Sequence, residues 1–130
     1  MSVFLVNKRL NGNYKFVFTN RKGHTVFTSI ACKRKEDCES IIDALRAHID
    51  KDEFVFTRKK TPAGKLYFRI SKGGLVLATS RKFSTELSME KGITHLLKYV
   101  PAAETLEMPK EEDIFGDTNK EEEESEDKNI

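Results

Sequence analysis

Histidine and serine side chains are the groups with which general acid–base or nucleophilic chemistry would begin in this chain of 130 residues. The pattern of turns and helices described below puts His24 in a turn, whereas His48 and His95 fall in two different helices. Ser80 and Ser84 have no histidine close in the sequence that would act as a base. Active sites are marked by groups that perturb one another, and these groups are scattered. The sequence therefore predicts a non-enzymatic protein without a cofactor, and an enzyme using Ser80, Ser84 or His95 is the less favoured alternative.

Two cysteines, Cys32 and Cys38, lie six residues apart, and no second pair or histidine at ligand spacing completes a zinc site. A 51-residue shift of the sequence aligns them with Phe83 and Met89, which are apolar. Free cysteine commonly behaves as a small core residue, so two buried, reduced thiols are expected. A redox pair is the alternative interpretation.

The basic run Lys33, Arg34 and Lys35 comes directly before a predicted helix. A helix start has free backbone N–H groups, so together with these side chains it forms a candidate anion site. The competing interpretation is structural, because Glu36 and Asp37 in the first turn offset the unfavourable interaction between positive charges and the helix dipole.

A mixed basic and aromatic surface is expected on the face of the predicted sheet that points away from the helices. Its candidate residues are Lys15, Val17, Val55, Tyr67 and Arg69. Such a surface would stack on and neutralise a single-stranded nucleic acid, but it lacks the paired aromatics on adjacent strands that make an RNA-binding signature specific. A protein partner, bound by this open sheet face or by a sheet edge, is the leading interpretation. A homodimer contact and a merely solvated face are further alternatives.

Charge divides the chain near residue 103. Residues 1–103 contain 20 Lys and Arg against 9 Asp and Glu, a net charge of +11, whereas residues 104–130 contain 3 against 12, a net charge of −9. The second segment has few hydrophobic residues and is expected to be a disordered acidic tail. This division motivates the alternative function, in which the basic body binds a polyanion such as a nucleic acid and the tail inhibits that binding.

The candidate residues are carried by a pattern of strands and helices that occurs twice. Short β-rich runs at 3–7 and 54–57 are each followed by a turn, an alternating strand, a second turn and a third strand. Apolar residues then recur at helical spacing and predict two amphipathic helices of about 14 residues. Matching positions that define the repeat are Gly23 and Gly74, Ser29 and Ser80, Ile42 and Ile93, and Leu45 and Leu96. Gly92 stands in the stripe where the first copy has Ile41, which predicts a close approach between that helix and the sheet.

Each β-β-β-α unit has one apolar sheet face and one apolar helix stripe, and a unit of this size is marginally stable by itself. Residues 1–51 and 52–103 are therefore expected to be two repeats with one shared core, followed by the tail at 104–130. The predicted fold class is α+β: a duplicated β-β-β-α unit forming a pseudo-two-fold antiparallel sheet of about six strands, with two helices on one face. The sequence contains no apolar run of signal-peptide or membrane-spanning length, so a cytoplasmic protein is expected.

A recognisable combination of motifs lies in the second half. It comprises an aromatic strand, a Lys-Gly-Gly turn, the strand end Ala78-Thr79-Ser80, and Phe83-Ser84-Thr85 leading into a helix with Gly92-Ile93. Over about residues 3–100 the chain resembles the YegP-like proteins, small bacterial proteins built from one or two copies of this unit. The first half departs from that pattern, with Cys32 in place of an aromatic and Ile41 in place of the helix glycine. The resemblance implies the duplication, but it implies no activity, because the family has no assigned biochemical function and no recognised catalytic residues.

Overall fold

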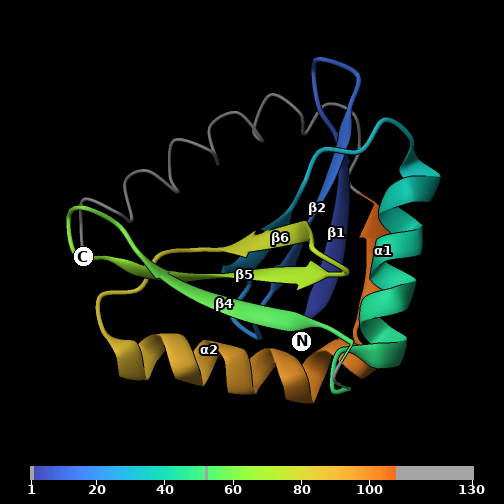
Figure 1. Ribbon diagram of the computed structural model, residues 1–130. Coiled ribbons are helices and arrows are strands. Elements are labelled where there is room, and N and C mark those ends of the chain that lie inside the picture. The colour runs from blue at the N-terminus through green and yellow to red at the C-terminus, as the bar shows by residue number, and fades with distance from the viewer. Residues whose placement is uncertain (1, 52, 108–130) are drawn as a thin grey trace.

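A computed structural model describes residues 2–51 and 53–107, which fold into one sheet and two main helices (Figure 1). The strands are β1 (Val3–Lys8), β2 (Tyr14–Thr19), β3 (Thr25–Ser29), β4 (Val55–Lys60), β5 (Leu66–Lys72), β6 (Leu75–Ser80) and β7 (Glu104–Glu107). The helices are α1 (Lys35–His48) and α2 (Glu86–Tyr99), and α2 is followed by the short 3-10 helix η1 (Val100–Ala102). Every strand and helix predicted between residues 3 and 100 is present, because alternation and helical spacing are local signals.

The strands form a single seven-stranded sheet in the order β4-β5-β6-β3-β2-β1-β7. Neighbouring strands are antiparallel except at one edge, where β7 pairs with β1 in parallel. Two predictions therefore need correction: the sheet has seven strands instead of about six, and it is mixed instead of antiparallel. The additional strand is Glu104–Glu107, the first part of the predicted acidic tail, which forms a strand because β1 offers it a ladder of backbone partners. The rest of that predicted tail, residues 108–130, lies outside the described residues.

The strands β3 and β6 join the two halves, and their register relates the halves by an approximate two-fold axis. Thr28 pairs with Thr79, which is its own counterpart after the 51-residue shift. On either side of this pair, Phe27 is opposite Ser80 and Ser29 is opposite Ala78. A strand that pairs antiparallel with its own counterpart through matched residues creates a local two-fold axis. The geometry is that of a pseudo-two-fold sheet, while the common origin of the halves stays a prediction.

Both helices bury the apolar stripe predicted for them. Ile42 and Leu45 of α1 and Ile93 and Leu96 of α2 are all 5% exposed or less. Helix α1 stands beside β1 and β7, and α2 runs along β4 and β5 (Figure 1). The matched apolar positions therefore lie in the interior in both halves.

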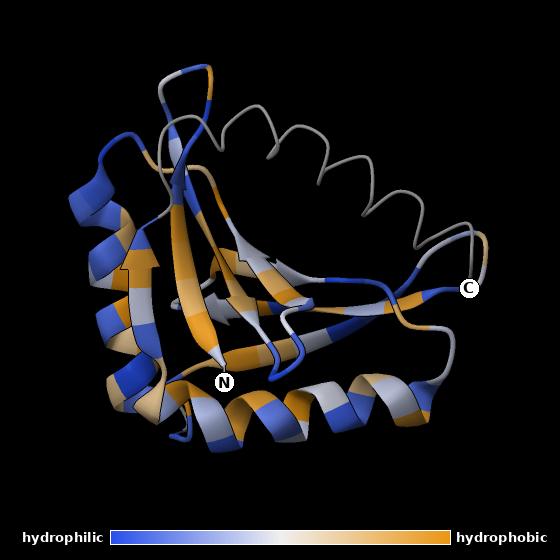
Figure 2. Ribbon diagram, turned by 180° about the vertical axis from the view of Figure 1, so that it is seen from behind, coloured by the Kyte–Doolittle hydropathy of each residue, from blue (hydrophilic) through white to orange (hydrophobic). Residues whose placement is uncertain are grey.

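The core lies between the two helices and one face of the sheet. Arg46 of α1 lies over the ring of Phe4, and the imidazole of His95 of α2 packs against the ring of Phe18. Because Phe4 and Phe18 are opposite each other on β1 and β2, both helices cover the same sheet face, as predicted. Figure 2 shows the hydrophobic residues concentrated on the central strands and on the helix sides that face them. The large side chains of this interior include Phe16, Phe27, Phe68, Ile70 and Met89.

The matched residues Ser29 and Ser80 have the same structural role in the two halves. The Ser29 hydroxyl accepts a hydrogen bond from the backbone N–H of Phe16 at 2.9 Å and donates to the carbonyl of the next residue at 2.8 Å. The Ser80 hydroxyl accepts from the N–H of Phe68 at 2.9 Å and donates to the carbonyl that follows it at 2.6 Å. Each hydroxyl thus satisfies a buried backbone donor that would otherwise lack a partner.

The repeat-defining glycines serve two different purposes. Gly23 and Gly74 close hairpin turns with φ of +88° and +81°, a conformation that other residues rarely adopt. Gly92 lies inside α2, and a Cβ added there would be only 3.0 Å from Cζ of Phe83. Glycine at this position therefore lets α2 approach the Phe83 ring closely.

Candidate protein-binding edge of the sheet

The strand β4 forms the outer edge of the second half, and within the described residues nothing pairs with its outer side. Where the β4–β5 hairpin closes, the N–H of Thr61 donates to the carbonyl of Lys65 at 2.8 Å. Hydrogen-bonded and non-hydrogen-bonded pairs alternate along an antiparallel ladder, so the backbone groups of Phe56, Arg58 and Lys60 point away from β5. This edge therefore presents backbone donors and acceptors to which another strand could pair.

At the opposite edge, β7 pairs with residues 3–6 of β1. Arg46 of α1 donates from Nε to the carbonyl of Ala103 at 2.7 Å, and its Nη2 donates to the hydroxyl of Thr105. Lys35 of α1 forms an ion pair with Glu107 at 2.7 Å, and this hydrogen bond raises the pKa of Lys35. Two positive side chains of α1 thus hold an acidic strand against β1.

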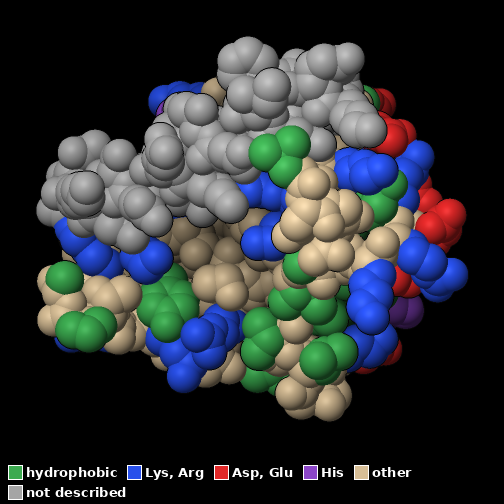
Figure 3. Space-filling view, turned by 90° about the horizontal axis from the view of Figure 1, so that it is seen from above, with side chains coloured by type: hydrophobic (Ala, Val, Ile, Leu, Met, Phe, Trp, Pro, Cys, Tyr) green, Lys and Arg blue, Asp and Glu red, His purple; other side chains and the backbone are tan. Residues whose placement is uncertain are grey.

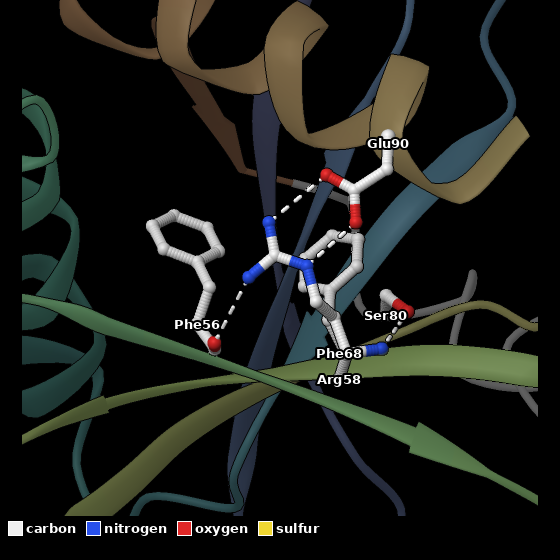
Figure 4. Close-up of polar contacts among 5 residues, drawn as sticks. All are labelled: Phe56, Arg58, Phe68, Ser80 and Glu90. Atoms are coloured by element: carbon white, nitrogen blue, oxygen red, sulfur yellow. Dashed lines mark hydrogen bonds and ion pairs between the residues drawn. The ribbon is translucent and has the colours of Figure 1, made fainter. Parts of the chain in front are cut away.

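In the second half, Arg58 lies between β4 and α2 (Figure 4). Its guanidinium donates through Nε and Nη2 to the two carboxylate oxygens of Glu90, at 2.6 and 2.9 Å. Its Nη1 donates to the carbonyl of Phe56 at 3.3 Å, which is one of the outward-pointing acceptors of the edge. The bidentate contact lowers the pKa of Glu90 and raises the pKa of Arg58. Arg58 therefore covers part of the β4 edge with its own side chain.

The predicted binding-face residues begin with a row that crosses the sheet opposite the helices. Val17 pairs with Thr28, and Arg69 pairs with Thr79. The two threonines pair with each other across the two-fold axis. Val17 and Arg69 therefore lie on the same face of the sheet, each one strand away from the central strands β3 and β6.

The remaining residues of the predicted face follow from the alternation of side chains along the strands. Lys15 and Tyr67 each lie two residues before a member of the row and share its face, and Val55, 54% exposed, lies on β4. The guanidinium of Arg69 and the ammonium of Lys82 are 5.7 and 5.9 Å from the centre of the Tyr67 ring. Figure 3 shows Lys and Arg side chains around a hollow on the side of the molecule away from α2. Two cations therefore lie beside the Tyr67 ring, and what this sheet face binds stays a prediction.

Ion pairs engage two of the three cations predicted to hold an anion at the start of α1. Arg34 is the N-cap residue but makes no capping bond with its side chain, and its Nη2 instead lies 3.2 Å from Oδ1 of Asp37. That hydrogen bond raises the pKa of Arg34. Lys35 is bound to Glu107 on β7, and Lys33 is exposed. Carboxylates thus balance two of the three charges, and anion binding at the start of α1 stays a prediction.

The side chains considered for catalysis have separate structural partners. The Ser80 hydroxyl is engaged with backbone groups, whereas Nε2 of His95 lies 3.2 Å from the hydroxyl of Ser2. Burial, followed by the nearby charges of Arg21 and Lys98, lowers the pKa of His95. Across residues 2–51 and 53–107, no three His, Cys, Asp or Glu side chains gather in a way that could hold a metal ion. Neither helix in this part of the chain has the length and apolarity needed to cross a bilayer.

The two cysteines are both buried and both thiols are free. Burial raises the pKa of Cys32, and it raises the pKa of Cys38 to about 12. A thiol kept neutral in this way is a weak nucleophile. The pair therefore has the properties of core residues, as the favoured interpretation predicted.

Comparison with known proteins identifies the fold and the relatives of this chain. No protein-family model matches it. The solution structure of yegP from E. coli, a protein of unknown function, superimposes with a TM-score of 0.73 at 21% identity, covering 82% of this chain and 91% of that one. The UPF0339 protein in the ptx operon 5′ region of Stutzerimonas stutzeri is 26% identical over 98 residues, covering 75% of this chain and 87% of the relative. The chain is thus similar to the YegP and UPF0339 proteins.

A second solved structure supports the same fold for this YegP-like chain. The UPF0339 protein of Shewanella oneidensis gives a TM-score of 0.75 at 17% identity, covering 82% of this chain and 90% of that one. The E. coli protein is described as being of unknown function. The resemblance expected from the sequence is thus confirmed, and the relatives bring a fold without an assigned activity.

Sequence reasoning missed the two features that distinguish the edges of the YegP-like sheet. It assigned Glu104–Glu107 to the tail, and it did not connect Arg58 with Glu90, which lies 32 residues later. The available signals were weak: Thr105 and Leu106 interrupt the acidic composition, and a basic residue in a short β-rich run is typical of an edge strand.

Proposed function

We propose that this YegP-like chain is a non-catalytic protein-binding module whose partner adds an extended segment to the β4 edge. The proposal rests on a difference between the two sheet edges formed by β1 and β4. The strand β1 is covered by β7, whereas its counterpart β4 presents outward backbone groups that pair with no strand in the described part of the chain. In this mode of recognition, backbone hydrogen bonds supply affinity and neighbouring side chains supply specificity. The positive charges of Lys59 and Lys60 oppose pairing of β4 with a second β4.

The experiment replaces one outward N–H of the edge. Lys60→Pro removes that donor, while the ladder to β5 is retained because the backbone of Lys60 points away from it. Lys60→Ala is the matched control, since it removes only the side chain. The full chain and both variants, immobilised at equal density, are incubated with bacterial lysate, and captured proteins are quantified by mass spectrometry after circular dichroism has verified folding.

The expected result is a partner captured equally by the unmodified chain and by Lys60→Ala, and captured at least about tenfold less by Lys60→Pro, because proline also keeps the neighbouring backbone from pairing. Equal capture by all three proteins, or capture of no protein by any of them, refutes binding at the β4 edge.

Polyanion binding is the second candidate function, and the cluster of Arg69, Lys82 and Tyr67 favours it. We propose that the basic face binds a polyanion and that residues 108–130 inhibit this binding. Truncation after Glu107 tests the idea while retaining β7, whereas truncation after Ala103 would also uncover β1. The shorter chain should elute from heparin at higher salt than the full chain and should bind single-stranded nucleic acid with a steep salt dependence. Identical elution of the two proteins refutes inhibition by the acidic segment.

We also propose that the halves are two copies of one β-β-β-α unit. The paired hydroxyl contacts of Ser29 and Ser80 and the self-counterpart pair Thr28 and Thr79 support this proposal. Under this proposal β1 and β4 are equivalent strands, so their outer edges can be compared residue by residue.

A further inference from the structure

The β1 edge, which pairs with β7, shows how a strand could be added to the β4 edge. In β1, Val6 is opposite Phe16, and in β4, Arg58 is opposite Phe68. Phe16 and Phe68 are counterparts, because each donates its N–H to a matched serine at 2.9 Å. Arg58 therefore stands on β4 where Val6 stands on β1. The residue of β7 that pairs with Val6 is Glu107.

A strand added to β4 as β7 is added to β1 would run parallel to it and place one residue opposite Arg58. On the covered edge that residue, Glu107, reaches Lys35 of α1 and so points to the helix side of the sheet. Arg58 also points to the helix side, where it meets Glu90 of α2. The side chain of the added residue would therefore lie beside the guanidinium of Arg58.

The present partner of Arg58 is exchangeable. The Arg58 and Glu90 side chains are 46% and 40% exposed, and ion pairs at such exposure contribute little to stability because water screens them. The same guanidinium donates to the carbonyl of Phe56 at 3.3 Å, an acceptor that an incoming strand would need. An arriving carboxylate that takes Arg58 would release this carbonyl for the new strand.

We propose that the β4 edge selects an extended protein segment that runs parallel to β4 and carries an acidic residue opposite Arg58, which exchanges Glu90 for that residue. This inference rests on the proposed protein-binding function and specifies its ligand. Charge complementarity carries the choice of occupant: Arg58, Lys59 and Lys60 follow one another on β4, so an acidic segment is attracted and a second β4 is repelled.

The test is a titration of the ¹⁵N-labelled full chain with a synthetic probe, followed by NMR. The probe is the acetylated and amidated peptide Ala-Ala-Glu-Thr-Leu-Glu, which has the sequence of residues 102–107 and ends at the residue that pairs with Val6 on the covered edge. The control peptide has Gln in place of the last Glu. Shifts of the amide signals of Phe56, Arg58 and Lys60 locate binding on β4 and give the dissociation constant. A spin label at the peptide N-terminus reports its direction.

The Glu peptide is expected to bind about two- to fivefold more tightly than the Gln peptide, as for a cross-strand pair of opposite charges. Glu90→Gln, which removes the competing carboxylate, should tighten binding of the Glu peptide by a similar factor. Arg58→Gln should abolish the difference between the two peptides. The spin label should broaden the signal of Val55 more than that of Lys60, since the strands are expected to be parallel.

Three outcomes overturn the inference. Equal binding of both peptides at β4 refutes selection of an acidic residue and leaves the proposed function intact, because that function is decided separately by the Lys60→Pro capture experiment. Shifts confined to Phe4 and Val6 show that the probe exchanges with β7 instead of binding to β4. If truncation after Glu107 shifts the β4 signals without any peptide, the occupant is the chain's own residues 108–130 and not an external partner.

Discussion

The two halves fill the space between strand and helix with different pairs of side chains, and this difference leads to a quantitative prediction. Phe83 forms a two-way backbone bridge with Leu66, at 2.8 and 2.7 Å, and Cys32 forms the same bridge with Tyr14, at 2.7 Å in both directions. The second half therefore combines a large residue at this bridge with glycine in the helix stripe, whereas the first half combines Cys32 with Ile41. The two combinations distribute a similar volume differently between strand and helix.

To test this, the two residues of the second half are replaced by their first-half counterparts. The variants are Phe83→Cys, Gly92→Ile and the double variant that carries both changes. Phe83 is 3% exposed, so its truncation should cost about 2–4 kcal/mol in the free energy of unfolding through lost burial and the cavity left behind. At residue 92 even a Cβ would lie 3.0 Å from Cζ of Phe83, and overpacking of this kind costs about 1–3 kcal/mol. The better helix propensity of isoleucine returns about 0.5 kcal/mol.

If the two positions were independent, the double variant would lose about 2.5–6.5 kcal/mol, the sum of these three contributions. We expect it to lose less than about 2 kcal/mol, because isoleucine would fill the space that the phenylalanine ring leaves, giving a coupling energy within the range known for residues in contact. The assay is urea unfolding followed by far-ultraviolet circular dichroism, with the reverse exchange, Cys32→Phe with Ile41→Gly, as the matched control. A double variant whose loss equals the sum of the single losses refutes the complementary packing of these positions.

Three further predictions concern the interior. Ser80→Ala and Ser29→Ala should each lower the free energy of unfolding by about 1–3 kcal/mol, since each leaves a buried backbone N–H without an acceptor. Urea unfolding measures this free energy. If both variants lose less than the experimental error, the two hydroxyls do not stabilise the fold in the way described above. The lowered pKa of His95 means that the unfolded chain takes up a proton at a higher pH than the folded chain, so the free energy of unfolding should fall as the pH drops below the ordinary histidine pKa. Between about pH 7 and pH 5, the range around that pKa, the His95→Gln variant should lose less stability than the unmodified chain. Parallel stability curves for the two proteins would exclude His95 as the source of the decline. Cys32 and Cys38, buried and with raised pKa values, should react with a thiol reagent at least about a hundredfold more slowly in the folded chain than in urea; equal rates would show that they are accessible.

The fold could be predicted to a large extent because its signals are local. The spacing of Ile42 and Leu45, and of Ile93 and Leu96, specifies which side of each helix is buried, and all four side chains are in the interior. The alternation around Phe16 and Phe68 likewise specifies the inner face of each middle strand. The candidate site was less predictable. Lys15, Val17, Tyr67 and Arg69 could be assigned to the outer face from alternation, but no local pattern distinguishes a covered sheet edge from an open one.

The sequence by itself determined the first six strands, the two main helices and the faces they bury, because period two and the helical period are properties of neighbouring residues. The tertiary structure alone decided that β3 pairs with β6, that Glu104–Glu107 pairs with β1, and that Arg58 meets Glu90. Backbone hydrogen bonds between strands are the same for almost every residue type, so pairing between distant segments leaves little trace in the sequence. The difference between a β1 edge covered by β7 and an exposed β4 edge therefore emerges only when the chain is folded.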